Sequence, residues 1–497
     1  MGHPAIFIPG NAGSYQQVRS IASSTSRQYH GHPGKRAEPL SGATKIDMFT
    51  REFASQSGDH VISRLTIVDL NEDFSAFHPQ LIREQADYLA HAVRHIAGLY
   101  EQGTRITLIG HSMGGIVARL SMELGIEDMI DMIITMSTPH QFPPVTLDGD
   151  FDRIYGEIAR DISPILVNIC GGAADTQIAS DACALLLDTD RGLTVFSTAI
   201  PGAWTGVDHQ AMVWCHQVRW VVARLLLEAT MVNSSPEKLG IARQLLYVGH
   251  RAPEARNPSR RFEVNGLTTF LLASPPSAVS ACDNSGCRPL DHDIQPYPRP
   301  AAGSPFPLPG EGVKQDDTRY ALSLNWTGSV VFDVAGEVES GTFSHVVPPI
   351  LQWTPSPSHT THYRLKYPTL ESHSLAVHRL RIGLESCSGP VPIVRYAPYA
   401  ASNLVEERFF PADSPDILLH PHIARAPFAP STRPQGMRLD IYQSPDCPVT
   451  SIAVNLEIWR SLAKAVHRYR MAAVAWTLGW SALIVDLCLL RTEQSCE

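Results

Sequence analysis

Apolar runs alternate with helical patterns over the first half of the chain. Runs of apolar and β-branched residues predict buried strands at Ala5–Ile8, Leu65–Leu70, Ile106–Ile109, Met129–Met136, Ile165–Ile169 and Leu193–Ser197. Apolar residues at helical spacing predict helices between them, over Ser14–Ala22, Ile82–Ile96, Ile116–Leu124, Phe151–Ile162 and Gln210–Glu228. Strands that alternate with helices indicate an α/β fold with a parallel sheet and crossover connections.

From about residue 240 the pattern changes from helical to alternating. Prolines accumulate, and short stretches place apolar residues at every second position, as in 320–326, 380–384, 437–441 and 452–458. Several such strands separated by turn residues predict a β-rich domain of the sandwich or jelly-roll type.

Residues 471–490 form a run of twenty mostly apolar residues, flanked by Arg468, Arg470 and Arg491. A helix of that length spans a bilayer, so the run predicts a hydrophobic transmembrane helix. A buried amphipathic helix is the alternative. The basic flank before the run also conflicts with a lumenal globular part, because such flanks are typically cytosolic.

These patterns divide the chain into three parts. We expect an α/β domain over residues 1–235, a β-rich domain over 240–460 and the start of a transmembrane region over 464–497. A core strand so close to residue 1 favours a truncated N-terminus. Residues 24–45 are rich in Ser, Gly, Pro and His, and are expected to form an exposed insertion.

The composition is that of a globular protein, with 44% hydrophobic and 18% charged residues. A formal net charge of −9 and the absence of repeated basic runs argue against a nucleic-acid partner. The nine cysteines form no CxxC pairs, so a zinc ribbon is not expected. Cys282 with Cys287, and Cys387 with Cys447, are possible disulfides, but the sequence fixes neither pairing.

Residues 105–119 carry the strongest chemical signal. An apolar strand is followed by Gly110-His-Ser-Met-Gly114 and then by a helical pattern, which is the G-x-S-x-G arrangement of a nucleophile elbow. A sharp strand-to-helix turn exposes Ser112 and points the N–H of Met113 to the place where an oxyanion forms. The alternative is an ordinary glycine-rich turn with a solvent-exposed serine.

Pro9-Gly-Asn-Ala-Gly-Ser14 follows the first strand. This loop lacks the Lys-Ser/Thr of a P-loop and the spacing of a dinucleotide fingerprint. In a serine hydrolase the same place supplies the second oxyanion donor, and the backbone N–H of Asn11 or Ala12 is the candidate. An ordinary turn between strand and helix remains the alternative.

Asp175 and His209 each lie just after a predicted strand, as Ser112 does. Carboxyl ends of parallel strands share one edge, where ligands bind. The order Ser, Asp, His is that of α/β-hydrolases, so we expect His209 to be the base and Asp175 to orient it. Rival acids for this role are Asp208, Asp181, Asp188 and Asp190.

No metal or cofactor is expected. His91 and His95 lie four residues apart on one helical face, but no carboxylate stands at ligand spacing, so a solvated face is the better interpretation.

Five blocks of the sequence together resemble one known family. They are Phe7-Ile-Pro-Gly-Asn-Ala-Gly-Ser-Tyr-Gln-Gln-Val-Arg-Ser20, Val68-Asp-Leu-Asn-Glu-Asp-Phe-Ser-Ala-Phe-His78, Gly110-His-Ser-Met-Gly-Gly-Ile-Val-Ala-Arg119, Ile133-Ile-Thr-Met-Ser-Thr-Pro-His140 and Trp204-Thr-Gly-Val-Asp-His209. In this order they resemble the GPI inositol-deacylases, lipase-like α/β-hydrolases. The β-rich part is similar to the family only in general arrangement.

The resemblance implies hydrolysis of the acyl ester on the inositol of GPI-anchored proteins, which prepares them for export from the endoplasmic reticulum. It implies Ser112, Asp175 and His209 as the triad, membrane lipid and GPI-anchored proteins as partners, and an endoplasmic reticulum membrane location with the catalytic domain in the lumen. By the same resemblance, we expect this chain to begin after the family's N-terminal anchor and to retain at most one of the family's several later transmembrane helices. Two other functions are compatible with the same residues: a general lipase or lysophospholipase, and a catalytically silent trafficking adaptor for GPI-anchored proteins.

Overall fold

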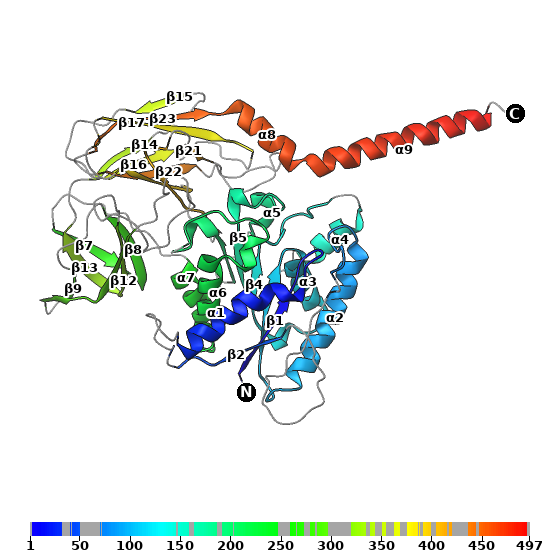
Figure 1. Cartoon of the computed structure of the whole chain (residues 1–497), viewed down its shortest axis with the longest axis horizontal. Coiled ribbons are helices and arrows are strands. Elements are labelled where there is room, and N and C mark those ends of the chain that lie inside the picture. The colour runs from blue at the N-terminus through cyan, green and yellow to red at the C-terminus, as the bar shows by residue number, and fades with distance from the viewer. Residues whose placement is uncertain are drawn as a thin grey trace.

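The structure is a computed structural model of the 497-residue chain, shown in Figure 1. It describes residues 2–31, 40, 42–49, 70, 72–145, 148–158, 164–185, 191–201, 203–246, 259–264, 266–272, 279–283, 286–296, 320–333, 338–342, 350–353, 362–367, 375–385, 387, 391–398, 404–414, 417–419, 436–443 and 447–494.

A parallel seven-stranded sheet organises the first half of the chain, in the order β19-β6-β5-β4-β3-β1-β2. Its strands are β1 (His3–Ile8), β2 (Ile46–Phe49), β3 (Ile106–His111), β4 (Ile130–Met136), β5 (Ile165–Cys170), β6 (Gly192–Phe196) and β19 (Leu404–Val405). Parallel strands need crossover connections, and here these carry the helices. The predicted α/β-hydrolase fold is confirmed.

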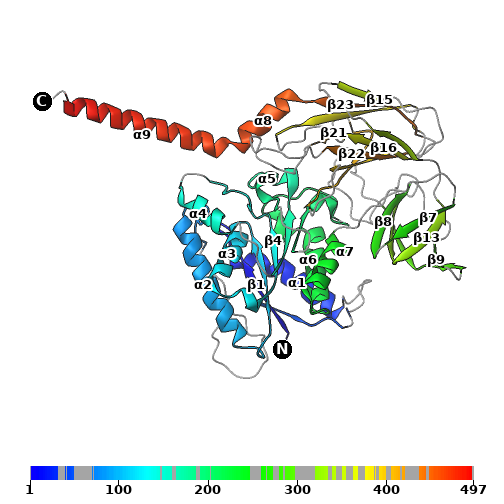
Figure 2. The ribbon, with the colours of Figure 1, turned by 180° about the vertical axis from the view of Figure 1, so that it is seen from behind.

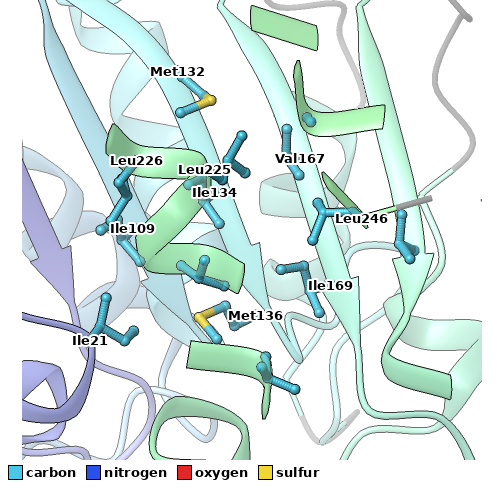
Figure 3. Close-up of a cluster of buried hydrophobic side chains, with 14 of the residues drawn as sticks. Ile21, Ile109, Met132, Ile134, Met136, Val167, Ile169, Leu225, Leu226 and Leu246 are labelled. Atoms are coloured by element: carbon cyan, nitrogen blue, oxygen red, sulfur yellow. The ribbon is translucent and has the colours of Figure 1, made fainter. Parts of the chain in front are cut away.

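Helices cover both faces of this sheet. They are α1 (Arg19–His30), α2 (Pro79–Ala97), α3 (Met113–Ser121), α4 (Asp150–Glu157), the short α5 (Ser180–Cys183), α6 (His216–Ala229) and α7 (Ser235–Leu246). Alternate residues of β4 point to opposite faces. Ile134 packs with α1, α6 and α7, as Figure 3 shows in part, whereas Ile133 packs with α2, α3 and α4. Burial on both faces explains why these strands read as continuous apolar runs.

Two local predictions differ from the structure, one helix was not predicted, and one predicted strand lies outside the described residues. The helix predicted over Ser14–Ala22 is a 3₁₀ turn at Tyr15–Val18 followed by α1, which continues to His30. Residues 24–30 are therefore helical rather than part of an exposed insertion, because Thr25 and Gln28 are buried against the neighbouring structure. Helix α7 was not predicted. The predicted strand at residues 65–69 lies outside the described residues.

Two pairs of sheets form the β-rich part. The first pair has the orders β10-β9-β13-β7 and β11-β12-β8, and the second β14-β16-β22-β18-β20 and β15-β23-β17-β21. Their strands are β7 (Ser259–Val264), β8 (Leu267–Leu272), β9 (Val279–Asp283), β10 (Gly286–Pro289), β11 (His292–Pro296), β12 (Tyr320–Asn325), β13 (Gly328–Asp333), β14 (Val338–Thr342), β15 (Ile350–Trp353), β16 (His362–Tyr367), β17 (His378–Leu384), β18 (Ile393–Pro398), β20 (Arg408–Pro411), β21 (Ile417–Leu419), β22 (Met437–Tyr442) and β23 (Val449–Leu456). Within each pair one apolar core holds residues of both sheets, which is sandwich packing.

The β-rich part touches the parallel sheet directly. Strand β19, from the β-rich half of the sequence, pairs with β6 at the sheet edge through Leu404 and Val405. Trp204, five residues before His209, packs in one cluster with Ile393, Phe409 and Tyr442. The loop that carries the predicted base is therefore supported by the later half of the chain.

Two helices end the described chain, α8 (Ile458–Arg468) and α9 (Arg470–Gln494). Ile458 was predicted to end a strand, but it begins α8. Figures 1 and 2 show α9 projecting away from the rest of the molecule. The transmembrane helix predicted at 471–490, within the region 464–497, is not supported, because no helix among the described residues combines the length and the apolar character that crossing a membrane requires. Polar Thr477 and Ser481 interrupt the apolar run, and their hydroxyls bond to the helix backbone.

Three disulfides join described cysteines. Cys282–Cys287 and Cys387–Cys447 are the two pairings that the sequence left open. The third, Cys170–Cys183, was not expected, and it closes the loop that carries Asp175.

Candidate active site

Ser112 occupies the sharp turn between β3 and α3. Its φ of 54° and ψ of −128° lie in a region that residues other than glycine rarely adopt. The flanking glycines permit this turn by close approach: a Cβ on Gly114 would lie 2.3 Å from the Ile8 carbonyl oxygen, and one on Gly110 would lie 2.6 Å from Gly115. The strained serine is what a nucleophile elbow requires.

Three predicted side chains meet at this turn. His209 Nε2 lies 3.0 Å from Ser112 Oγ, and His209 Nδ1 lies 3.0 Å from Asp175 Oδ2. All three residues are buried, with exposed fractions of 5% for Ser112, 6% for Asp175 and 3% for His209. The histidine therefore bridges a hydroxyl and a carboxylate, which is the arrangement of a serine–histidine–acid triad.

Asp175 is held by its own loop. Its Oδ1 accepts hydrogen bonds from the N–H groups of Gln177 and Ile178, which leaves Oδ2 to face the histidine. Asp208 points elsewhere, because its carboxylate accepts from the N–H groups of Gln210 and Ala211.

The other rival acids are not at the histidine either. Asp181 pairs with Arg468. Asp188 and Asp190 lie outside the described residues.

The glycine-rich loop lies against Ser112. A Cβ on Gly10 would be 2.5 Å from Ser112 Cβ and 3.1 Å from its Oγ, so only glycine allows this approach. The N–H of Ala12 donates to the Asp73 carbonyl oxygen, which leaves Asn11 as the candidate donor of the loop. The Asn11 side chain accepts from the N–H of Ala76 and so ties the loop to the segment before α2. Met113 begins α3, with its N–H at the helix N-terminus.

His111, the residue before Ser112, makes a contact that sequence reasoning missed. Its Nε2 lies 3.0 Å from the carbonyl oxygen of His209, and the two rings are 4.9 Å apart. Burial and the nearby His209 lower the pKa of His111 to about 3. His111 is therefore neutral at physiological pH and donates its Nε2–H to the His209 backbone.

A buried polar network on the parallel sheet supports the loop that carries Asp175. Asn168 on β5 donates to the Cys183 carbonyl oxygen at 2.8 Å and also bonds to Thr135 and Thr194. With the Cys170–Cys183 disulfide, it fixes both ends of that loop to the sheet. An isolated Asn in an apolar strand was the only sequence signal for this network.

Among the described residues, no group of three or more His, Cys, Asp and Glu side chains is arranged to hold a metal ion. His91 is exposed, and its Nδ1 lies 2.9 Å from the Asp87 carbonyl oxygen one turn earlier on α2.

The parallel sheet, the elbow between β3 and α3, and the polar groups at the carboxyl edge define an α/β-hydrolase. Residues 1–229 match the family described as the PGAP1-like alpha/beta domain. A GPI inositol-deacylase of Cryptococcus neoformans var. neoformans serotype D (strain JEC21) is 37% identical over 521 residues, covering 97% of this chain and 57% of the relative. The GPI inositol-deacylase of Eremothecium gossypii is 36% identical over 284 residues, covering 50% of this chain and 26% of the relative.

The chain belongs to the GPI inositol-deacylase family, which confirms the resemblance of the five blocks. It spans little more than half the length of the Cryptococcus relative. Among solved structures it is similar to Aspergillus fumigatus lipase B, with a TM-score of 0.31 and 12% identity over 50% of this chain and 57% of that one. It is also similar to phospholipase PlaB of Legionella pneumophila, with a TM-score of 0.30 and 11% identity over 65% of this chain and 81% of that one.

Proposed function

We propose that this chain is a serine hydrolase that removes the acyl chain from the inositol of GPI-anchored proteins. The observation that carries the proposal is the pair of 3.0 Å contacts that His209 makes with Ser112 and Asp175, in a chain of this family. The acyl group is joined to inositol through a carboxylic ester, and ester hydrolysis is the chemistry that such a triad performs.

The first half of the reaction transfers the acyl group to the enzyme. Ser112 Oγ attacks the ester carbonyl carbon while His209 Nε2 takes the hydroxyl proton. The tetrahedral intermediate carries a negative oxygen, which accepts hydrogen bonds from the backbone N–H groups of Met113 and Asn11. When the intermediate collapses, the bond to the inositol oxygen breaks, and His209 gives its proton to the departing inositol hydroxyl.

The second half releases the fatty acid. Water attacks the acyl–Ser112 ester as His209 takes its proton, and the proton then returns to Ser112 Oγ. Throughout, Asp175 Oδ2 accepts from the Nδ1–H of His209, which fixes the tautomer and stabilises the imidazolium. No step needs a metal or a cofactor.

The location and partners belong to the same proposal. Three disulfides fit an oxidising compartment, which supports a catalytic part in the lumen of the endoplasmic reticulum. Exposed apolar side chains on α8 and α9, including Trp459 and Trp476, fit contact with membrane lipid. Removal of the acyl chain from GPI-anchored proteins there prepares them for export.

The test uses the full chain in detergent with a fluorophosphonate probe and an inositol-acylated GPI lipid. We expect the probe to label wild-type protein and not Ser112→Ala. We expect the lipid to release free fatty acid and to become sensitive to phosphatidylinositol-specific phospholipase. In cells that lack the activity, wild type restores phospholipase-sensitive anchors, and equal restoration by Ser112→Ala contradicts the proposal.

The alternatives give different results in the same assays. Cleavage of simple phospholipids with no action on the acylated GPI lipid identifies a general lipase. A correctly folded chain that the probe does not label identifies a binding adaptor without catalysis.

A further inference from the structure

The loop that carries Asp175 is held from outside the α/β-hydrolase fold. We name residues 171–182 the acid loop, because they lie between the disulfide-bonded Cys170 and Cys183 and contain Asp175. The disulfide and Asn168 fix the two ends of this loop. Its outer part, residues 176–181, meets the junction between α8 and α9, almost 300 residues later in the sequence.

Arg468, the last residue of α8, makes the central contact. Its Nε donates to Asp181 Oδ2 at 2.8 Å, and the Asp181 carboxylate is almost fully buried, with 3% of its side chain exposed. The guanidinium also lies 3.7 Å from the ring centre of Phe142. Phe142 packs against Ile178 and Ala182 of the acid loop, so Arg468 holds the loop both directly and through this ring.

A second arginine reaches the residue next to the acid. Arg470 donates to the carbonyl oxygen of Thr176 at 3.1 Å. The following N–H groups, those of Gln177 and Ile178, are the donors that orient Asp175 Oδ1. A displacement of residues 176–181 therefore turns the carboxylate away from His209.

Arg468 is also the cation beside Asp181 that keeps its charge as the pH rises. Burial and Arg408 lower the pKa of Lys464, one turn earlier on α8, to about 8, although the charges of Glu406 and Asp181 oppose this. Lys464 therefore loses its charge in mildly alkaline solution, whereas a guanidinium stays protonated. Above that pH Arg468 remains the charged partner of the Asp181 carboxylate.

We propose that Arg468 is a positioning residue for the hydrolysis: through Asp181 and Phe142 it holds the acid loop so that Asp175 stays bonded to His209. The inference rests on the proposed function, because it assigns a role within the same triad. It makes turnover depend on the C-terminal helices, although all three triad residues lie within the first 209 residues.

The experiment compares Arg468→Leu with wild type in the full chain, with p-nitrophenyl butyrate as the soluble ester. We expect kcat to fall between about 10- and 100-fold, because displacing a catalytic group by an ångström has an effect of that order. KM is expected to change by less than about twofold, because the ester does not touch Arg468.

Arg364→Leu is the matched control. The Arg364 side chain is 11% exposed and its Nε donates to Asp440 at 2.7 Å, against 16% and 2.8 Å for Arg468 and Asp181. Arg364 lies on β16 in the β-rich part, so its loss lowers stability without touching the acid loop. We expect its kcat, per active site titrated with the fluorophosphonate, to equal that of wild type.

Two further variants complete the test. Arg468→Lys keeps the charge and is expected to recover part of kcat. Asp181→Asn removes the same contact from the side of the loop, and it tests the inference even if Arg468→Leu does not fold. In the double variant, Arg468→Leu should lower kcat little further than Asp181→Asn alone. An unchanged kcat in Arg468→Leu and Asp181→Asn overturns the inference while the probe still labels Ser112. Failure of wild type to be labelled overturns the proposed function instead.

Discussion

His111 forms a hydrogen bond to the backbone of His209: its Nε2 lies 3.0 Å from the His209 carbonyl oxygen, although 98 residues separate the two in the sequence. The bond runs from the turn that carries Ser112 to the loop that carries His209. It fixes the main chain of His209, while Asp175 fixes the ring. A neutral histidine thus fixes the position of the His209 loop relative to the turn that carries Ser112.

Replacement of His111 tests this relationship. We expect His111→Leu to lower kcat by about 10- to 100-fold, because the His209 carbonyl loses a buried donor and the ring of His209 is no longer held in register. His111→Gln places an amide N–H near the position of Nε2 and should keep most of the activity. Steady-state kinetics with a soluble ester distinguish the two variants. A kcat equal to that of wild type in both would show that the bond is dispensable.

Two neighbouring acids separate the roles of Asp175 and Asp208. We expect Asp175→Asn to lower kcat by roughly 10³- to 10⁴-fold, because an amide in place of the carboxylate favours the wrong tautomer of His209. Asp208→Asn removes the same charge one residue before His209 but leaves the triad contacts in place, so its kcat should stay within about twofold of wild type. A larger loss of kcat from Asp208→Asn than from Asp175→Asn would show that Asp208, and not Asp175, is the acid that orients His209.

The Cys170–Cys183 disulfide is expected to stabilise the site as well as the fold. A loop of this size contributes about 3 kcal/mol to the free energy of unfolding through the entropy of the unfolded chain. The double variant Cys170→Ser/Cys183→Ser should therefore lose stability in urea denaturation and also lose turnover, because the acid loop carries Asp175. The matched variant Cys282→Ser/Cys287→Ser lies in the β-rich part and should keep kcat unchanged. Equal kcat in both double variants would limit the first disulfide to a structural role.

Buried histidines predict that the fold weakens in acid. Burial lowers the pKa of His111 to about 3, and burial with the charge of Arg119 lowers that of His140 well below its ordinary 6.5. Between pH 6.5 and the folded-state pKa values, the unfolded chain binds protons at these residues that the folded chain does not. The free energy of unfolding therefore falls as the pH falls, by up to about 1.4 kcal/mol per pH unit for each histidine.

Urea denaturation at pH 7, 6 and 5 measures this slope. His140→Gln removes one of the two groups, and its stability should depend less steeply on pH than that of wild type. The same slope in wild type and His140→Gln would show that His140 binds its proton equally in both states.

Local sequence determined the elements that build the parallel sheet. The strands around Ile6, Ile109, Ile134 and Val167 were predictable because strands buried on both faces must be apolar throughout. The elbow at Ser112 was predictable because a strained turn between strand and helix needs glycines within two residues of the serine. The positions of Ser112, Asp175 and His209 just after strands, in that order, were enough to nominate the three residues that the structure brings together, with Asp208 still a rival for the acid.

Tertiary structure alone decided how these residues are held. The choice of Asp175 over Asp208 depends on where each carboxylate points, which the spacing of residues along the chain does not specify. The bond from His111 to His209, the Cys170–Cys183 disulfide and the contact of Arg468 with Asp181 join positions 98, 13 and 287 residues apart. Such contacts depend on how the folded elements pack against one another, so no local pattern of apolar and polar residues predicts them. The physical reason is that the periodicity of apolar residues reflects which face of one helix or strand is buried. The position of a site side chain depends instead on how separate elements pack together.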